Sequence, residues 1–376
     1  MAEKPYLSIA DKADYCSYID GWRGIAILLV VAVHTSQLFG NSNHGNFIFD
    51  CSGKLFNSGA RGVQLFYILS AFTLFNSSYR RFKRDLHPKR NFYLRRAFRI
   101  LPLWLIVSAV FTYLDNKPLL VGASSATFLF GFFRFDESFE VVPGGWSLFV
   151  EETFYLMLPV IFGKITTLRK AANYSIALIV LAVVWSASPL LGLPVPETNY
   201  FIFLAPPNHW YIFGIGIMLY YMGSLDWLRG RISSCTWSWD LAAFCLMPIV
   251  MTRYLSAIAA MFAFCIYVSS VEGTLLNKIT NNSLLRRFGV YCYSIYLLHF
   301  LILRFTAPQI QSLIKMMNLQ DAPAEVQFCM AFPIVAAVAL AMGYGCFNLI
   351  EKPSVRLGRL AIERIESRAV LVPECS

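Results

Sequence analysis

Charged residues are scarce in this sequence. Only 14% of its 376 residues are charged and 57% are hydrophobic, whereas about a quarter of the residues of a soluble domain carry charge. A soluble protein of this size could not bury so much apolar surface without exposing large patches. Apolar runs of about 17–25 residues, the length that crosses a bilayer, recur along the chain. The composition therefore predicts a membrane protein.

The sequence also lacks the motifs of several enzyme classes. No Walker loop, GxGxxG fingerprint, GxSxG elbow or HExxH helix occurs, so nothing indicates a P-loop ATPase, a dehydrogenase, a serine hydrolase or a zinc protease. The nine cysteines include no CxxC pair, and we interpret them as packing residues without metal or disulfides. No apolar signal-peptide core precedes the first hydrophobic stretch, which we expect to be a permanent span.

Ten apolar stretches are expected to cross the membrane as helices. They cover approximately residues 22–40, 60–78, 99–115, 147–163, 173–193, 208–224, 238–252, 254–271, 289–306 and 326–350. An eleventh stretch, 119–133, is short and contains two glycines, so we expect a re-entrant or interfacial piece on the outer side. The predicted fold is an all-α polytopic membrane protein, with an N-terminal segment at 1–19, one membrane domain at 20–350 and a basic tail at 351–376.

The positive charge predicts the orientation in the membrane. The net charge is +10, but the positive residues do not form a stripe on one face, so we do not expect nucleic-acid binding. They gather in short loops, as the positive-inside rule expects. Segment 79–99 holds nine Lys and Arg residues against one acid, Asp85, while the opposite loop 194–207 has no Lys or Arg. Segment 79–99 is therefore expected in the cytoplasm, together with both termini, in a multi-pass protein of the inner (plasma) membrane.

The first span carries ionisable side chains, which are costly in lipid and commonly functional. It opens with Asp20-Gly21-Trp22-Arg23-Gly24 and contains His34. At about 100° per residue, Arg23 and His34 fall within about 20° on one helix face, roughly 16 Å apart along the axis, with Asp20 on nearly the same stripe. A neutral imidazole can act as a general base. The alternative is that Arg23 anchors the helix and His34 hydrogen-bonds to a neighbouring helix.

Two arginines, Arg96 and Arg99, precede Pro102 where the basic segment enters the third span. Positions i and i+3 point to one side of a helix, and two guanidinium forks there suit a phosphate or pyrophosphate. The alternative is that these charges only determine topology.

Two adjacent carboxylates, Glu151 and Glu152, lie in the fourth span. Neighbouring residues of a helix point about 100° apart, so one can face His34 while the other pairs elsewhere. A carboxylate bonded to the imidazole would orient it and stabilise its protonated form.

The ninth span contains a second histidine, His299, which shares a helix face with Tyr296 at i, i+3. Either His299 joins the site or it is a satisfied packing residue, and the sequence favours neither. Gln64 and Ser70 in the second span are interpreted as contacts between helices.

Together these segments resemble the integral-membrane acyltransferase 3 family, the sugar O-acetyltransferases of bacterial surfaces. The matching pieces, in the family's order, are Asp20–Gly24 with the Arg23-x10-His34 spacing, Gly62–Ser70, Arg96-x-x-Arg99, Trp146–Glu152, Ser294–His299 and Glu351-Lys352-Pro353. The resemblance covers about residues 18–355. It implies a ten-span fold and an acyl-CoA donor, usually acetyl-CoA, as co-substrate without a metal.

The resemblance also implies roles for the residues. His34 would be the catalytic histidine with Arg23 as its partner, and Glu151 or Glu152 would support it. We place Arg96, Arg99 and Asp20 with the coenzyme A, and His299 and Tyr296 as supporting residues.

The expected function is transfer of an acyl group from cytosolic acyl-CoA to a hydroxyl of a cell-surface or lipid-linked carbohydrate. The alternative from another class is a transporter or flippase of a glycolipid or acyl carrier, which would use the same intramembrane charges as a pathway. A sensor without catalysis is a third hypothesis, but it leaves the glutamate pair unexplained.

Overall fold

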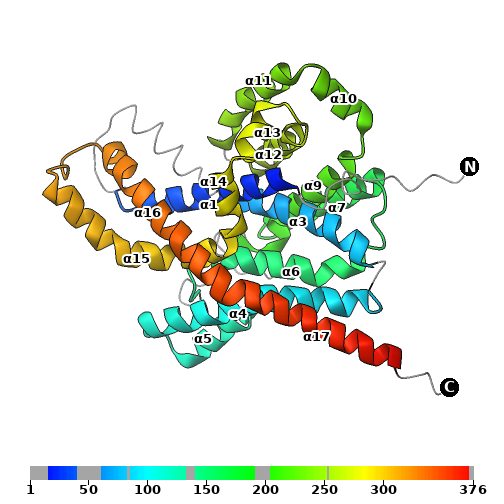
Figure 1. Ribbon diagram of the computed structural model, residues 1–376, viewed down its shortest axis with the longest axis horizontal. Helices are drawn as coiled ribbons and strands as arrows, with labels where there is room; N and C mark the ends of the chain where they lie inside the picture. Colours follow the sequence, from blue (N-terminus) through cyan, green and yellow to red (C-terminus); the bar gives the residue numbers. More distant parts are fainter. Residues whose placement is uncertain are drawn as a thin grey trace, which may run out of the picture. The chain divides into compact units, whose positions relative to one another are not determined.

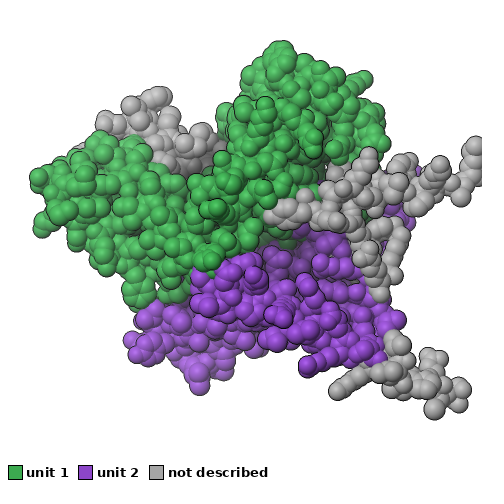
Figure 2. All heavy atoms as spheres, viewed as in Figure 1, with its two compact units in different colours: residues 1–71, 215–344 green, residues 72–214, 345–376 purple. Residues whose placement is uncertain are grey.

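A computed structural model describes residues 16–39, 61–82, 85–132, 140–190, 204–251 and 254–371. These residues form helices and no strand (Figure 1), so the all-α prediction is confirmed for the described chain. The structure divides into two compact units, one of residues 1–71 and 215–344 and the other of residues 72–214 and 345–376 (Figure 2). Most of segment 1–19, most of loop 194–207, Lys83 and Arg84 lie outside the described residues.

The first unit is built around the N-terminal helix α1. Besides the beginning of α3 (Gly62–Phe82) and the end of α9 (Trp210–Met222), its helices are α1 (Ser17–Ser36), α10 (Asp226–Ser234), α11 (Thr236–Leu246), η5 (Met247–Met251), α12 (Leu255–Ser269), α13 (Leu275–Thr280), α14 (Ser283–Val290), α15 (Cys292–Met316) and α16 (Ala324–Cys346).

The second unit contains the remainder of α3 and α9 and the basic part of the chain. Its other helices are α4 (Pro88–Leu114), α5 (Leu119–Ala126), η3 (Leu129–Phe132), α6 (Gly145–Ile161), α7 (Leu168–Ser186), η4 (Pro206–Asn208), the π-helical turn η6 (Phe347–Glu351) and α17 (Lys352–Leu371).

Each of the ten predicted spans overlaps a helix. Among the described residues, five helical stretches are long and apolar enough to cross a membrane, namely Ser17–Ser36, Pro88–Leu114, Leu168–Ser186, Cys292–Met316 and Ala324–Ser367. The apolar helices Gly62–Ser77, Trp210–Met222 and Leu255–Ser269 are shorter. Ten spans and cytoplasmic termini therefore stay predictions. The eleventh stretch contains α5, whose 8 residues are too few to cross.

The C-terminal segment is a helix of the second unit. α17 packs against α4, and the Glu366 carboxylate accepts hydrogen bonds from the Asn91 amide (2.6 Å) and the Leu86 backbone N–H (2.9 Å). A methyl group at Gly358 would lie 2.7 Å from the Cβ of Phe98, so the two helices touch closely at this glycine. Within the predicted basic tail at 351–376, residues 352–371 therefore form a helix, α17, that packs against α4.

Helix α1 packs so closely against α14 that backbone atoms of the two helices are in contact. A methyl group at Gly24 would lie 2.0 Å from the Leu285 carbonyl oxygen, and one at Gly289 would lie 1.7 Å from the Asp20 carbonyl oxygen. Membrane helices approach this closely through small residues, because lipid provides no hydrophobic drive for their association. The glycines beside the ionisable residues of the first span therefore have a packing role, which fixes α1 in the first unit.

We predict that Gly24→Ala destabilises the protein. Its methyl group overlaps a backbone carbonyl that cannot rotate away, and overpacking of this kind costs about 1–3 kcal/mol or more. The melting temperature in detergent micelles should fall. Gly230→Ala in α10 is the matched control, since no described atom lies within 4 Å of its added methyl group and alanine favours a helix by about 1 kcal/mol. Equal melting temperatures for Gly24→Ala and the wild type would contradict the close contact.

Cysteine labelling tests the predicted orientation. Leu86 lies in the basic segment with its side chain 54% exposed, so Leu86→Cys should react with a membrane-impermeant maleimide only in inside-out vesicles. All nine native cysteines, including the exposed Cys245 and Cys329, are replaced by serine in the background. Labelling of Leu86→Cys from outside intact cells would reverse the orientation and remove cytosolic acyl-CoA as the donor.

Candidate active site

His34 lies near the end of α1 and is half-buried. Its Nδ1 forms a hydrogen bond of 3.1 Å with Gln37 Oε1, one helical turn further on. Because an amide oxygen accepts, Nδ1 is the donor and Nε2 keeps its lone pair. His34 therefore presents Nε2 as a proton acceptor. Gln37 was not predicted as a site residue from the sequence, although its i+3 spacing from His34 was a signal.

The structure brings His299 of α15 beside His34. The two ring centroids are 5.1 Å apart, and Phe300 packs against both rings, at 4.4 Å from His34 and 4.2 Å from His299. The Tyr296 ring also flanks His299, with centroids 5.4 Å apart. The shared face of Tyr296 and His299 is confirmed, and His299 lies in contact distance of the predicted catalytic histidine.

His299 is fully buried, with 0% of its surface exposed. Its Nδ1 donates to the Tyr296 backbone carbonyl, which fixes the tautomer and leaves a lone pair on Nε2. That Nε2 is buried without a hydrogen-bond partner among the described residues. Buried polar atoms in proteins are almost always paired, so this nitrogen is suited to receive an O–H or N–H from a ligand.

The start of α1 holds an ion pair. Arg23 and Asp20 are 3.1 Å apart at i, i+3, and Asp20 is buried. All three predicted residues, Asp20, Arg23 and His34, lie in this one helix, as the sequence indicated. Since the rise of a helix separates Arg23 from His34 by roughly 16 Å, Arg23 can contact only a distant part of a ligand bound at His34. A carboxylate repels phosphate, so Asp20 is better suited to hold Arg23 than to bind coenzyme A itself.

Helix α6, which carries the two glutamates, begins at a glycine turn. Gly144 precedes it with φ of 77°, a left-handed conformation that glycine adopts without strain. The Glu140 carboxylate accepts a hydrogen bond of 3.1 Å from the Trp146 backbone N–H. This acid at the positive end of the helix dipole stabilises the first turn and sets where Glu151 and Glu152 lie.

Within the second unit, the glutamates lie near Arg96 of α4. The Arg96 guanidinium lies over the Tyr155 ring, 5.5 Å from its centroid, and the Tyr155 hydroxyl donates to the Glu151 carboxylate. Arg96 is within electrostatic range of both glutamates. Glu152 Oε1 is buried and has no hydrogen-bond partner in the described part of the chain. The predicted support of His34 by a glutamate joins residues of different units and stays a prediction.

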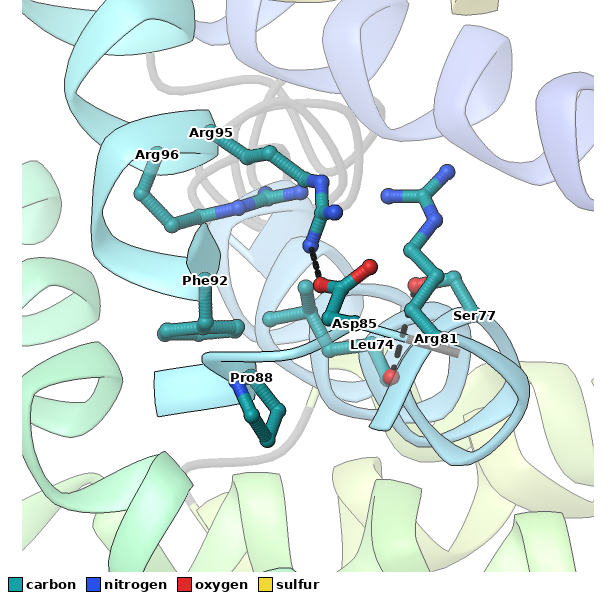
Figure 3. A pocket seen from close by; sticks show the side chains of 8 residues that line it. All are labelled: Leu74, Ser77, Arg81, Asp85, Pro88, Phe92, Arg95 and Arg96. Atoms are coloured by element: carbon teal, nitrogen blue, oxygen red, sulfur yellow. Dashed lines mark hydrogen bonds and ion pairs between the residues drawn. The ribbon is translucent and has the colours of Figure 1, made fainter. Parts of the chain in front are cut away.

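A small hollow lies beside Arg96 (Figure 3). It is lined by Leu74, Ser77, Arg81, Asp85, Pro88, Phe92, Arg95 and Arg96, and Arg95 is bound to Asp85 at 2.7 Å. Its volume of about 10 Å³ is enough for no more than a single water molecule. This hollow is too small for a phosphate. Arg99, one turn further along α4, instead lines a cavity of about 850 Å³.

The comparison with protein families agrees with this architecture. Residues 17–345 match the family model described as an acyltransferase domain. The match covers most of the chain, which therefore belongs to the acyltransferase 3 family.

Two curated proteins are similar to the chain. "Putative peptidoglycan O-acetyltransferase YrhL" of Bacillus subtilis (strain 168) is 24% identical over 340 residues, which cover 79% of this chain and 50% of that protein. "Acyltransferase MdmB" of Streptomyces mycarofaciens is 26% identical over 316 residues, 76% of this chain and 79% of that protein. The chain thus spans about half the length of the Bacillus protein. No solved structure matches.

We predict that the Arg96 guanidinium stabilises the second unit through its charge beside the half-buried Glu151 and Glu152. Arg96→Gln removes the cation beside these two half-buried side chains and its contact with the Tyr155 ring, and should lower the melting temperature. Adding Glu152→Gln removes the neighbouring carboxyl group, so the double variant should lose less stability than the sum of the two single variants. Exposed Arg90 on the same helix provides the control, since Arg90→Gln should leave the melting temperature unchanged. Additive effects of Arg96→Gln and Glu152→Gln would show that the two residues do not interact.

Proposed function

We propose that the protein is an O-acyltransferase that moves an acyl group, typically acetyl, from cytosolic acyl-CoA to a hydroxyl of a cell-surface or lipid-linked carbohydrate. The observation that carries this proposal is the pair of imidazoles, His34 and His299, each with an Nε2 lone pair, in a chain of an acyltransferase family. The peptidoglycan named for the Bacillus relative supports a carbohydrate acceptor, and the apolar helices support a membrane location.

The proposed reaction uses His34 as a general base. Its Nε2 removes the proton from the sugar hydroxyl while the hydroxyl oxygen attacks the thioester carbonyl carbon. The tetrahedral intermediate collapses, the carbon–sulfur bond breaks, and the proton on Nε2 passes to the leaving coenzyme A sulfur. Gln37 accepts from Nδ1–H throughout and keeps the ring oriented. A transient acyl group on His34 is the other route to the same products.

Other residues hold the two substrates in this scheme. Nε2 of His299 accepts a hydrogen bond from an O–H of the acceptor, which orients the sugar beside His34. Arg23, held by Asp20, lies roughly 16 Å along the helix, a position suited to the remote part of a long donor. Arg99 contacts the phosphates of the donor, while Arg96 and the glutamates organise the helix pair α4 and α6.

Replacing the base tests the proposal. His34→Ala should reduce transfer of labelled acetyl groups from acetyl-CoA to glycan in membrane vesicles by at least about 100-fold, the contribution of a positioned general base. The variant is compared at equal amounts of inserted protein. His87→Ala is the control, because His87 is an exposed residue before α4, and it should retain activity.

Normal glycan acylation by inserted His34→Ala protein would contradict the mechanism. Movement of a glycolipid across the membrane without consumption of acetyl-CoA would instead support a flippase. Mass spectrometry of surface glycans from cells with and without the protein identifies the acceptor through the acyl increment that disappears.

His299→Phe separates the two roles that the sequence left open for His299. Phenylalanine keeps an aromatic ring beside Phe300 and Tyr296 but removes the Nε2 acceptor, together with the Nδ1–H that the Tyr296 carbonyl accepts. Loss of one buried hydrogen bond to substrate should lower kcat/KM about 10- to 100-fold without lowering the melting temperature. Unchanged kcat/KM would assign His299 to packing alone.

A further inference from the structure

The cavity beside Arg99 belongs entirely to the second unit. It has a volume of about 850 Å³, and its lining includes Arg99 of α4, Phe347 of η6 and Lys352, Arg356, Arg359 and Leu360 of α17. Pockets for small molecules commonly measure about 300–1,000 Å³. The cavity is therefore large enough for a ligand, in contrast to the hollow beside Arg96.

The cavity is strongly basic. Four cations line it against one carboxylate, that of Glu351, which is buried at 4% exposure. Lys352, Arg356 and Arg359 follow the i, i+4, i+7 spacing that places side chains on one face of a helix. Like charges at this spacing repel and weaken a helix. An anion bound among these three side chains would remove that repulsion.

The chemistry of the lining indicates the kind of anion. Guanidinium groups bind phosphate through paired N–H donors, and three separate cationic side chains besides Arg99 exceed what one phosphodiester requires. The apolar lining, with Phe347 and Leu360, suits a ring or a chain attached to the phosphates. A molecule with a pyrophosphate, a phosphomonoester and a purine ring uses all of these features.

We infer that α17 completes the donor site: Lys352, Arg356 and Arg359 bind, with Arg99, the phosphate groups of the nucleotide end of acyl-CoA. This inference rests on the proposed function and extends it to the C-terminal helix. Arg99 is then the member of the Arg96-x-x-Arg99 motif that contacts the donor.

Donors with different phosphate content test the inference. Full-length Arg356→Gln/Arg359→Gln protein in lipid nanodiscs is compared with wild type using acetyl-CoA, acetyl-dephospho-CoA and S-acetylpantetheine, which has no phosphate. Loss of charge-assisted hydrogen bonds should raise the KM for acetyl-CoA about 10- to 100-fold. The KM for S-acetylpantetheine and the kcat should not change.

A matched control lies on the same helix. Arg364 is exposed and does not line the cavity, so Arg364→Gln removes one charge from α17 and should leave all three KM values unchanged. Equal KM values for the double variant and the wild type with acetyl-CoA would overturn the inference. So would an equal rise with acetyl-CoA and with S-acetylpantetheine, since that rise would not depend on phosphate.

A phospholipid headgroup is the other source of phosphate for this cavity. The measurements are therefore repeated in phosphatidylcholine nanodiscs with and without phosphatidylglycerol. An effect of the double variant that appears only with phosphatidylglycerol would assign the cavity to lipid and overturn the inference. If wild-type protein transfers acetyl from none of the donors, the proposed function fails, and equilibrium binding of coenzyme A decides the inference: weaker binding by the double variant supports it, and equal binding overturns it.

Discussion

The contact between α1 and α14 determines where the chemistry of the first unit lies. With no side chain at Gly24 and Gly289, the two helix backbones approach until a carbonyl oxygen occupies the place of a methyl group. Lipid does not force helices together as water does, so association depends on such close packing. A helix held in this way carries His34 at a fixed rise and rotation from the contact. The imidazole is positioned by the backbone, and only its ring orientation depends on Gln37.

Burial then gives the two histidines different properties. His34 is half-buried and bonded to a side chain at the end of its helix, so solvent or a substrate can reach it. His299 is fully buried, and its Nδ1 donates to the backbone carbonyl of Tyr296 in the same helix. A bare ring nitrogen away from water is costly unless a donor reaches it. The proposed reaction supplies that donor as a substrate hydroxyl, for a nitrogen that has no hydrogen-bond partner among the described residues.

The periodicity of the sequence predicted which site residues share one helix face. It could not predict which residues of different helices come together, because tertiary contacts determine that. The stripe of Asp20, Arg23 and His34 follows from helix geometry, so it was predictable. Hydropathy marks only the apolar part of a helix. The predicted span at 99–115 therefore missed the basic first part of α4, which begins at Pro88. The pairing of His34 with His299 joins distant parts of the sequence, and no pattern in either segment specifies it. Gln37 was missed because a polar residue at the end of an apolar run looks like a boundary.

The arginine motif of α4 shows how one spacing serves two purposes. The two guanidinium groups lie one turn apart, yet Arg96 lies over an aromatic ring of α6 and interacts electrostatically with its glutamates, while Arg99 lines a cavity formed with α17. An arginine beside acidic side chains has part of its charge offset within the protein, whereas an arginine among further cations attracts an anion from outside. The same residue type is therefore structural at one position and suited to a ligand at the next, and the distinction comes from the charges of the neighbouring helices.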